Sequence, residues 1–166
     1  LPITLSVLFM EIGRRIDLKF EGVGMPGHFL VRYVPGEGDS QLIDVFDGGE
    51  KLSREAAARK MFQITGGILN DEHLKPVDTA KIDRRMLRNL FGIAAKEGDQ
   101  AAMLRYTEAL VAVDPADVQH RGIRAILRQQ SGRRAAAIAD LDWFLEHKPA
   151  GLDLDRIREM KESFQE

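Results

Sequence analysis

The sequence predicts an α+β part followed by an all-α helical solenoid, and three observations lead to this prediction. Two strand-like runs, "HFLVRYV" and "QLIDVFD", are separated only by the turn-forming stretch "PGEGDS". From Ile82 onward no strand-like run occurs, and glycine and proline fall only between helical stretches. Residues 88–115 match residues 122–149 after a shift along the chain, at a period typical of stacked pairs of antiparallel helices.

The chain begins with a predicted helix that runs to about Ile16. Its apolar side chains recur at helical spacing, at Leu5, Leu8, Phe9, Ile12 and Ile16. We expect this face to point into a core, with Thr4 or Ser6 as the residue that caps the helix. Because the chain opens at Leu1 already inside the apolar pattern, we also expect the protein to continue upstream.

The next segments predict a small antiparallel sheet. "FEGVGMPG" is turn-rich, and the two strand-like runs form a predicted hairpin with its turn near residues 36–39. After Gly49, we expect Ser53 to cap a helix over "SREAAARKMFQIT". The first domain is predicted to span residues 1–76.

The second domain is predicted to span residues 82–166. We expect its helices at about 83–97, 100–113, 117–131, 134–147 and, as a polar-faced capping helix, 154–164. At the 34-residue shift Gly98 falls on Gly132, which indicates equivalent turns between helices. Trp143 lies on an apolar face and is expected to lie in the core between helices.

Composition excludes several classes of function. The chain has 24 basic and 26 acidic side chains and a net charge of −2, with no long block of one sign, so nucleic acid is not an expected partner. It contains no cysteine, which excludes disulfides and thiol nucleophiles from these residues and is typical of a cytoplasmic protein. The apolar start is broken by Glu11 and is too short to span a membrane. We expect neither a metal nor a cofactor, because His73, His120 and His147 lack ligand spacing.

Taken together, these stretches resemble the SirB-type bacterial family, in which a transglutaminase-like domain precedes tetratricopeptide repeats. The matching stretches are "LPITLSVLFMEIGRRIDLKFEGVGMPGHFLVRY", then "LIDVFDGG" with "LSRE", then the 34-residue helical repeats. The resemblance implies a transglutaminase-like (papain-like) remnant with a small antiparallel sheet, followed by an all-α tetratricopeptide-type solenoid. It also implies that the N-terminal part of the family's first domain lies upstream.

The same resemblance implies a site. The superfamily places a cysteine at the start of a helix, a histidine at the start of a following strand and an aspartate on the next strand. By that pattern His28 in "GHFLV" takes the histidine place and Asp44 in "LIDVF" the aspartate place. The cysteine place falls around Pro2 to Thr4, where no cysteine stands, so Thr4 is the candidate hydroxyl nucleophile.

Two interpretations of His28 and Asp44 stay open. A base that activates a nucleophile needs a third group to hold its ring in one tautomer, and a carboxylate on a neighbouring strand does this. Alternatively, a hydrogen bond between the two side chains only satisfies two polar groups at a sheet edge. Both interpretations predict that the two side chains lie within hydrogen-bonding reach.

The expected function is a non-enzymatic protein–protein interaction or regulatory scaffold, a pseudoenzyme with a protein or peptide partner. The retained His28 and Asp44 keep an alternative open, an amide or peptide hydrolase or acyl transferase with a hydroxyl nucleophile such as Thr4. A hydroxyl is hardly ionised at neutral pH and is a weaker nucleophile than a thiol, which favours the scaffold. Neither nucleic acid nor a membrane is an expected partner.

Overall fold

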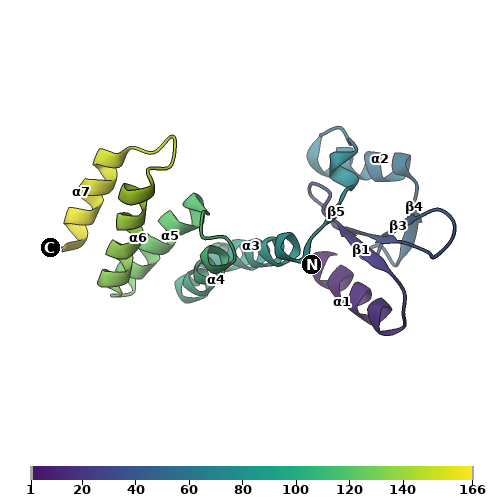
Figure 1. The fold of residues 1–166 in the computed structure, drawn as a ribbon, viewed down its shortest axis with the longest axis horizontal. Coiled ribbons are helices and arrows are strands. Elements are labelled where there is room, and N and C mark those ends of the chain that lie inside the picture. Colours follow the sequence, from purple (N-terminus) through teal and green to yellow (C-terminus); the bar gives the residue numbers. More distant parts are fainter. Residues whose placement is uncertain (1, 166) are drawn as a thin grey trace. The chain divides into compact units, whose positions relative to one another are not determined.

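The computed structural model describes residues 2–165, and Figure 1 shows their helices and strands. The chain divides into two compact units, Leu1–Met86 and Leu87–Glu166, and the division falls inside helix α3 (Thr79–Glu97). The outermost residues of the two predicted domains, Leu1 and Glu166, lie outside the described residues. The domain limits expected from the sequence stay a prediction.

The described part of the first unit is an antiparallel sheet with helices, in the strand order β4-β3-β2-β1-β5. The strands are β1 (Phe20–Val23), β2 (Leu30–Tyr33), β3 (Gln41–Asp44), β4 (Glu50–Leu52) and β5 (Pro76–Val77). The helices are α1 (Pro2–Arg15), α2 (Arg54–Thr65) and the short 3-10 helix η1 (Glu72–Leu74). This arrangement confirms the α+β fold class.

The predicted hairpin is present, but the sheet is larger than the sequence indicates. Strands β2 and β3 are paired, with Val31 opposite Ile43. "FEGV" was predicted as part of a turn-rich stretch, and this was wrong, because Phe20–Val23 forms β1 and pairs with β2. Strands β4 and β5 were not predicted. Segments of two to four residues are too short to show a clear alternation of apolar and polar side chains, so the sequence pattern does not reveal them. They become strands through pairing with their neighbours in the sheet.

The two faces of the sheet pack against different helices, because successive side chains of a strand point to opposite faces. One face and α2 enclose a buried core of Val23, Met25, Leu30, Leu52, Ala57, Met61 and Leu74. On the other face Phe20 packs against Phe9 of α1, with ring centroids 4.9 Å apart. A side chain at Gly13 would collide with the Phe20 ring, so this glycine lets α1 approach β1. Helices α1 and α2 therefore cover opposite faces (Figure 1).

Helix α1 packs through a different face from the predicted one. Its buried residues are Ile3, Ser6 and Gly13. Of the predicted core stripe, Phe9 is half-buried and packs on Phe20. The other four residues of the stripe are 45–62% exposed, namely Leu5, Leu8, Ile12 and Ile16. The predicted cap was also wrong, because α1 already includes Pro2 and Ile3, which precede both candidate cap residues. Thr4 and Ser6 thus lie inside α1, and Ser6 Oγ donates to the Pro2 carbonyl at 3.0 Å.

Substitution of the exposed stripe tests this correction. Leu8 is 56% exposed, so Leu8→Ala is expected to lower the free energy of unfolding by less than about 1 kcal/mol. Ile3 is 1% exposed, and Ile3→Ala, the matched control on the same helix, should lower it by about 2–5 kcal/mol. Urea denaturation followed by circular dichroism measures both values. Equal losses at the two positions would contradict the packing of α1 described here.

Within the described residues the second unit is helical throughout its regular structure, which confirms the all-α part. After α3 follow α4 (Gln100–Val113), α5 (Val118–Gln130), α6 (Arg134–His147) and α7 (Leu154–Gln165). The bounds agree with the predicted ones to within one residue, except that α3 begins at Thr79 rather than near residue 83. Gly98 and Gly132 both have positive φ, 70° and 76°, so the two turns use glycine in the same backbone conformation.

Trp143 lies at the edge of a core rather than inside it. The buried residues of this core are Ala125, Leu141 and Phe144, and the partly buried Trp143 packs against them. The Arg121 guanidinium lies 4.1 Å from the Trp143 ring centroid, and the His147 ring stacks on it at 4.4 Å. Two polar side chains therefore cover the indole.

We expect Trp143→Ala to lower the free energy of unfolding by about 2–3 kcal/mol, below the value for a fully buried aromatic residue. The variant loses contacts with the α5–α6 core and the cation–π contact with Arg121. Trp143→Phe keeps an aromatic ring at this position, so its free energy of unfolding should fall by less than half as much. Denaturant titration of the three proteins measures this, and a near-neutral Trp143→Ala would contradict it.

Candidate functional site

The loop between β1 and β2 carries His28 and packs closely on α2. Gly27 has φ of 74°, and a Cβ there would lie 2.5 Å from a side-chain carbon of Ile64. Both the backbone conformation and the close approach therefore require glycine. The His28 amide donates to the Met25 carbonyl at 3.1 Å, and the imidazole is only 8% exposed.

Asp44, the last residue of β3, accepts four hydrogen bonds through its fully buried carboxylate. Oδ1 accepts from the backbone N–H groups of Phe46 at 3.1 Å and Asp47 at 3.2 Å, which shapes the turn into β4. Oδ2 accepts from His28 Nε2 at 2.8 Å and from Lys60 Nζ at 2.5 Å. The Asp44 side chain is 0% exposed, so this network is closed to solvent on the carboxylate side.

The charge state of Asp44 fixes the tautomer of His28. Burial alone would raise the pKa of Asp44, but hydrogen bonds from Lys60, His28 and the Asp47 backbone outweigh it and lower that pKa below its ordinary value. The carboxylate is therefore ionised at neutral pH and can only accept hydrogen bonds. Nε2 of His28 is therefore the donor of this hydrogen bond, and in the tautomer that it selects Nδ1 is the acceptor nitrogen.

The structure brings together two of the three site residues predicted from the sequence. The predicted hydrogen bond between His28 and Asp44 is confirmed, and their role in catalysis stays a prediction. Thr4 is exposed on α1, the helix that covers the face opposite to α2. Within residues 2–165, no hydrogen bond joins Thr4 to His28 or Asp44.

Lys60 and Arg85 also belong to this site, and the sequence did not indicate either. Lys60 lies beside the buried positions of α2, which is a weak signal for a lysine directed at a neighbouring carboxylate. Arg85 of α3 donates to the Met25 carbonyl at 3.1 Å and to the His28 carbonyl at 2.8 Å. Its guanidinium lies 5.5 Å from the Phe29 ring centroid, and burial lowers its pKa. No sequence pattern foretells a contact between residues so far apart in the chain.

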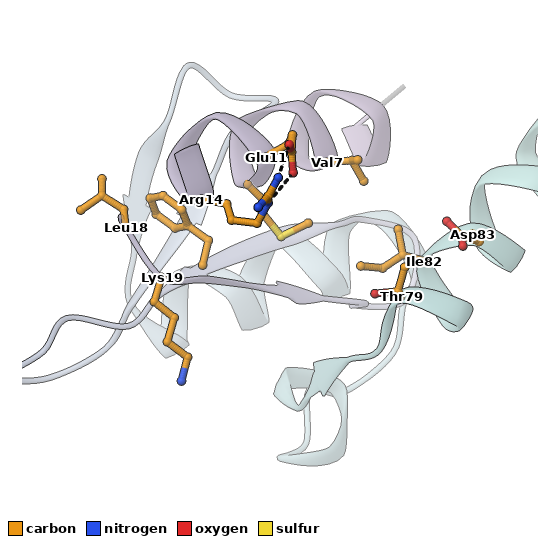
Figure 2. Close-up of a pocket in the computed structure, with 10 residues that line it drawn as sticks. Val7, Glu11, Arg14, Leu18, Lys19, Thr79, Ile82 and Asp83 are labelled. Carbon is orange, nitrogen blue, oxygen red and sulfur yellow. Dashed lines mark hydrogen bonds and ion pairs between the residues drawn. The ribbon is translucent and has the colours of Figure 1, made fainter. Parts of the chain in front are cut away.

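A hollow of about 330 Å³ lies beside α1 (Figure 2). Figure 2 shows Glu11 and Arg14 joined on α1, with Thr79 and Ile82 of α3 on another side of the hollow. Hydrogen bonds from Arg14 and Arg15 lower the pKa of Glu11 to about 2. The residues that line this hollow include none of the predicted site residues, so the hollow does not serve the His28–Asp44 pair.

Among residues 2–165, no three His, Cys, Asp or Glu side chains are grouped so that they could hold a metal ion. In the same residues, no helix combines the length and the apolar character needed to cross a membrane.

Comparison with known proteins finds two families, in order along the chain. Residues 1–88 match the Transglutaminase-like superfamily, and residues 90–162 match the Tetratricopeptide repeat family. A UPF0162 protein of Xylella fastidiosa is 30% identical over 162 residues, which are 95% of this chain and 57% of that protein. Protein SirB1 of Salmonella typhimurium is 26% identical over 160 residues, 95% of this chain and 58% of that protein. These matches confirm the resemblance, and the chain spans somewhat more than half the length of these relatives.

A further similarity covers a smaller share of the chain. F-box only protein 21 of Homo sapiens is 29% identical over 112 residues, 63% of this chain and 17% of that protein. No solved structure matches the chain.

Proposed function

Because the chain belongs to the transglutaminase-like superfamily over residues 1–88 and continues into tetratricopeptide repeats, we propose that it is a non-enzymatic protein-binding scaffold. In this proposal the repeats contact a protein or peptide partner, and the transglutaminase-like unit keeps its histidine and aspartate for structural reasons. The proposed location is the cytoplasm of a bacterial cell, as the cysteine-free composition and the SirB-type resemblance indicate.

The observation that carries the proposal is the closed network around Asp44. Its carboxylate is used by two backbone N–H groups of the β3–β4 turn, by His28 and by Lys60. Lys60 neutralises part of the negative charge that would otherwise stabilise an imidazolium at His28, which is the form a general base reaches during catalysis. In this proposal the His28–Asp44 pair and Lys60 hold together the β3–β4 turn, the start of β2 and helix α2.

The available nucleophiles also support a role without catalysis. The 166 residues contain no cysteine, so a thiol would have to come from outside them. Ser6 is fully buried and donates its hydroxyl proton to the Pro2 carbonyl, while Thr4 is exposed on α1. A hydroxyl depends on its base for activation, and neither hydroxyl is hydrogen-bonded to His28 in the described residues.

One observation favours the alternative, an amide or peptide hydrolase or acyl transferase. The His28–Asp44 hydrogen bond of 2.8 Å holds one tautomer and leaves Nδ1 of His28 as a proton acceptor. This is the orientation that a base needs next to a nucleophile. The alternative therefore requires a nucleophile that reaches Nδ1.

A fluorophosphonate probe, which labels activated hydroxyls, tests the two proposals against each other. The scaffold proposal predicts that the probe does not label the folded chain. It also predicts that the substitution His28→Ala does not change the labelling pattern. Labelling at Thr4 or Ser6 that His28→Ala removes, with circular dichroism showing that the variant is folded, would establish the enzyme instead. Denatured protein serves as the control for labelling that does not depend on the fold.

A further inference from the structure

Three arginines of α5 share a single carboxylate of α6. Arg121, Arg124 and Arg128 bind Asp140 at 3.2, 2.5 and 2.9 Å, and we call these four residues the arginine cluster. The three arginine side chains are only 10–17% exposed, and the Asp140 side chain is 2% exposed. Within residues 2–165, the buried Nε atoms of Arg121 and Arg128 have no hydrogen-bond partner, so acceptors are scarce in the cluster.

The positive charge continues from the cluster to the surface. Glu108 of α4 binds Arg128 at 3.4 Å and Arg133 at 2.9 Å. Arg133 and the exposed Arg105 line a hollow of about 470 Å³ together with Glu108, and we call it the charged hollow. Four guanidinium groups thus share two carboxylates, and a fifth, that of Arg105, lines the same hollow, in a chain whose net charge is −2.

A second hollow adjoins the first and is apolar. It measures about 350 Å³ and is lined by Gly98, Gln100, Met103, Ile123, Ile126, Leu127 and Gln130. We call it the apolar hollow. Gln100 and Leu127 line both hollows. Leu127 is buried and Gln100 is exposed, so a short extended segment that crosses Gln100 contacts both hollows.

We propose that these two hollows bind a segment of a protein partner in which an acidic residue stands close to a large apolar residue. The acidic side chain pairs with Arg105 and Arg133 in the charged hollow, and the apolar side chain enters the apolar hollow beside Ile126. Guanidinium groups suit carboxylates because they donate paired hydrogen bonds in one plane. The inference rests on the proposed protein-binding function and names the chemistry of the partner.

Charge and shape favour an acidic peptide over a nucleic acid. Glu108 lies in the wall of the charged hollow and interrupts its positive charge, so the hollow has no continuous basic track for a phosphate backbone. A single carboxylate needs only the guanidinium groups of Arg105 and Arg133. The neighbouring hollow offers an apolar surface next to the charge, which an alternating acidic and apolar peptide covers. Charge complementarity of this kind sets the choice of partner.

Fluorescence anisotropy with the full chain tests the inference. The probe is a fluorescein-labelled peptide of alternating aspartate and leucine, and its neutral counterpart has asparagine in place of aspartate. We expect the acidic peptide to bind about tenfold more tightly than the neutral one, and added salt to narrow the difference. Equal binding of the two peptides, or displacement of the acidic peptide by a single-stranded RNA at equal concentration, would overturn the inference.

Matched variants test whether the peptide binds in the two hollows. Arg133→Gln should weaken binding of the acidic peptide about tenfold, while Arg158→Gln should change it less than about twofold. The two arginine side chains are 56% and 55% exposed and each pairs with one carboxylate, so they differ in position only. Ile126→Ser should weaken binding about three- to tenfold, and Ile93→Ser, outside both hollows and similarly exposed, should not.

The outcomes separate this inference from the proposed function. Equal losses of peptide affinity in Arg133→Gln and Arg158→Gln would mean that the peptide responds only to overall charge, and the inference would fail. The scaffold proposal would still stand if the fluorophosphonate probe did not label the chain. Labelling by the fluorophosphonate probe would remove the non-enzymatic proposal whatever the peptide does. Circular dichroism of each variant shows whether it is folded.

Discussion

Asp140→Ala is expected to lower the free energy of unfolding by about 3–5 kcal/mol, the largest effect that we predict for the helical unit. Asp140 is 1% exposed and is the shared partner of Arg121, Arg124 and Arg128. Without it, three nearly buried guanidinium groups repel one another, and only Arg128 keeps a carboxylate partner, Glu108. The loss is large because the charges that remain are uncompensated and poorly hydrated.

Urea denaturation of Asp140→Ala and of Asp142→Ala measures this effect against a matched control. Asp142 is on the same helix and its side chain is 51% exposed beside Lys161, so its replacement should change the free energy of unfolding by less than about 1 kcal/mol. If Asp140→Ala does not fold, Asp140→Asn keeps the shape of the side chain and should still be clearly destabilised. Similar stabilities of the Asp140 and Asp142 variants would show that the cluster contributes nothing to the fold.

Asp44→Ala is expected to destabilise the first unit by about 3–5 kcal/mol. The substitution removes the acceptor for two backbone N–H groups of the β3–β4 turn and leaves Lys60 and His28 without their shared carboxylate. Asp47→Ala is the matched control, because Asp47 also binds Lys60 but its side chain is 55% exposed. For the control we expect the free energy of unfolding to fall by less than about 1 kcal/mol.

The contribution of Asp44 should also depend on pH. Because the folded-state pKa of Asp44 is lowered, its ionised form stabilises the fold at neutral pH, and this stabilisation is lost as the pH falls through the lowered pKa. The difference in free energy of unfolding between the natural chain and Asp44→Asn should therefore be largest above about pH 5 and should shrink toward pH 2. A difference that grows on acidification would contradict the ionised network.

The sequence determined the helices of the second unit almost completely. Their apolar periodicity, the glycines at Gly98 and Gly132 and the 34-residue repeat are local or regularly spaced signals. They predicted the helix bounds within about a residue, except for the start of α3, which lies at Thr79. Ser53 was likewise a sufficient local signal, since its side chain accepts from the Ala56 N–H and α2 begins after it. The hairpin turn between β2 and β3 and the family pattern together predicted the His28–Asp44 hydrogen bond.

Only the tertiary structure decided which faces are buried and which distant groups meet. The helical spacing of α1 fits more than one face, and packing on Phe20 selected the face with Gly13 instead of the one with Leu8. Strands β1, β4 and β5 are too short to be stable alone and form because neighbouring strands accept their hydrogen bonds. Lys60, Arg85 and the arginine cluster depend on contacts between separate elements. A periodic pattern records what one segment favours by itself, whereas these contacts depend on where other segments lie.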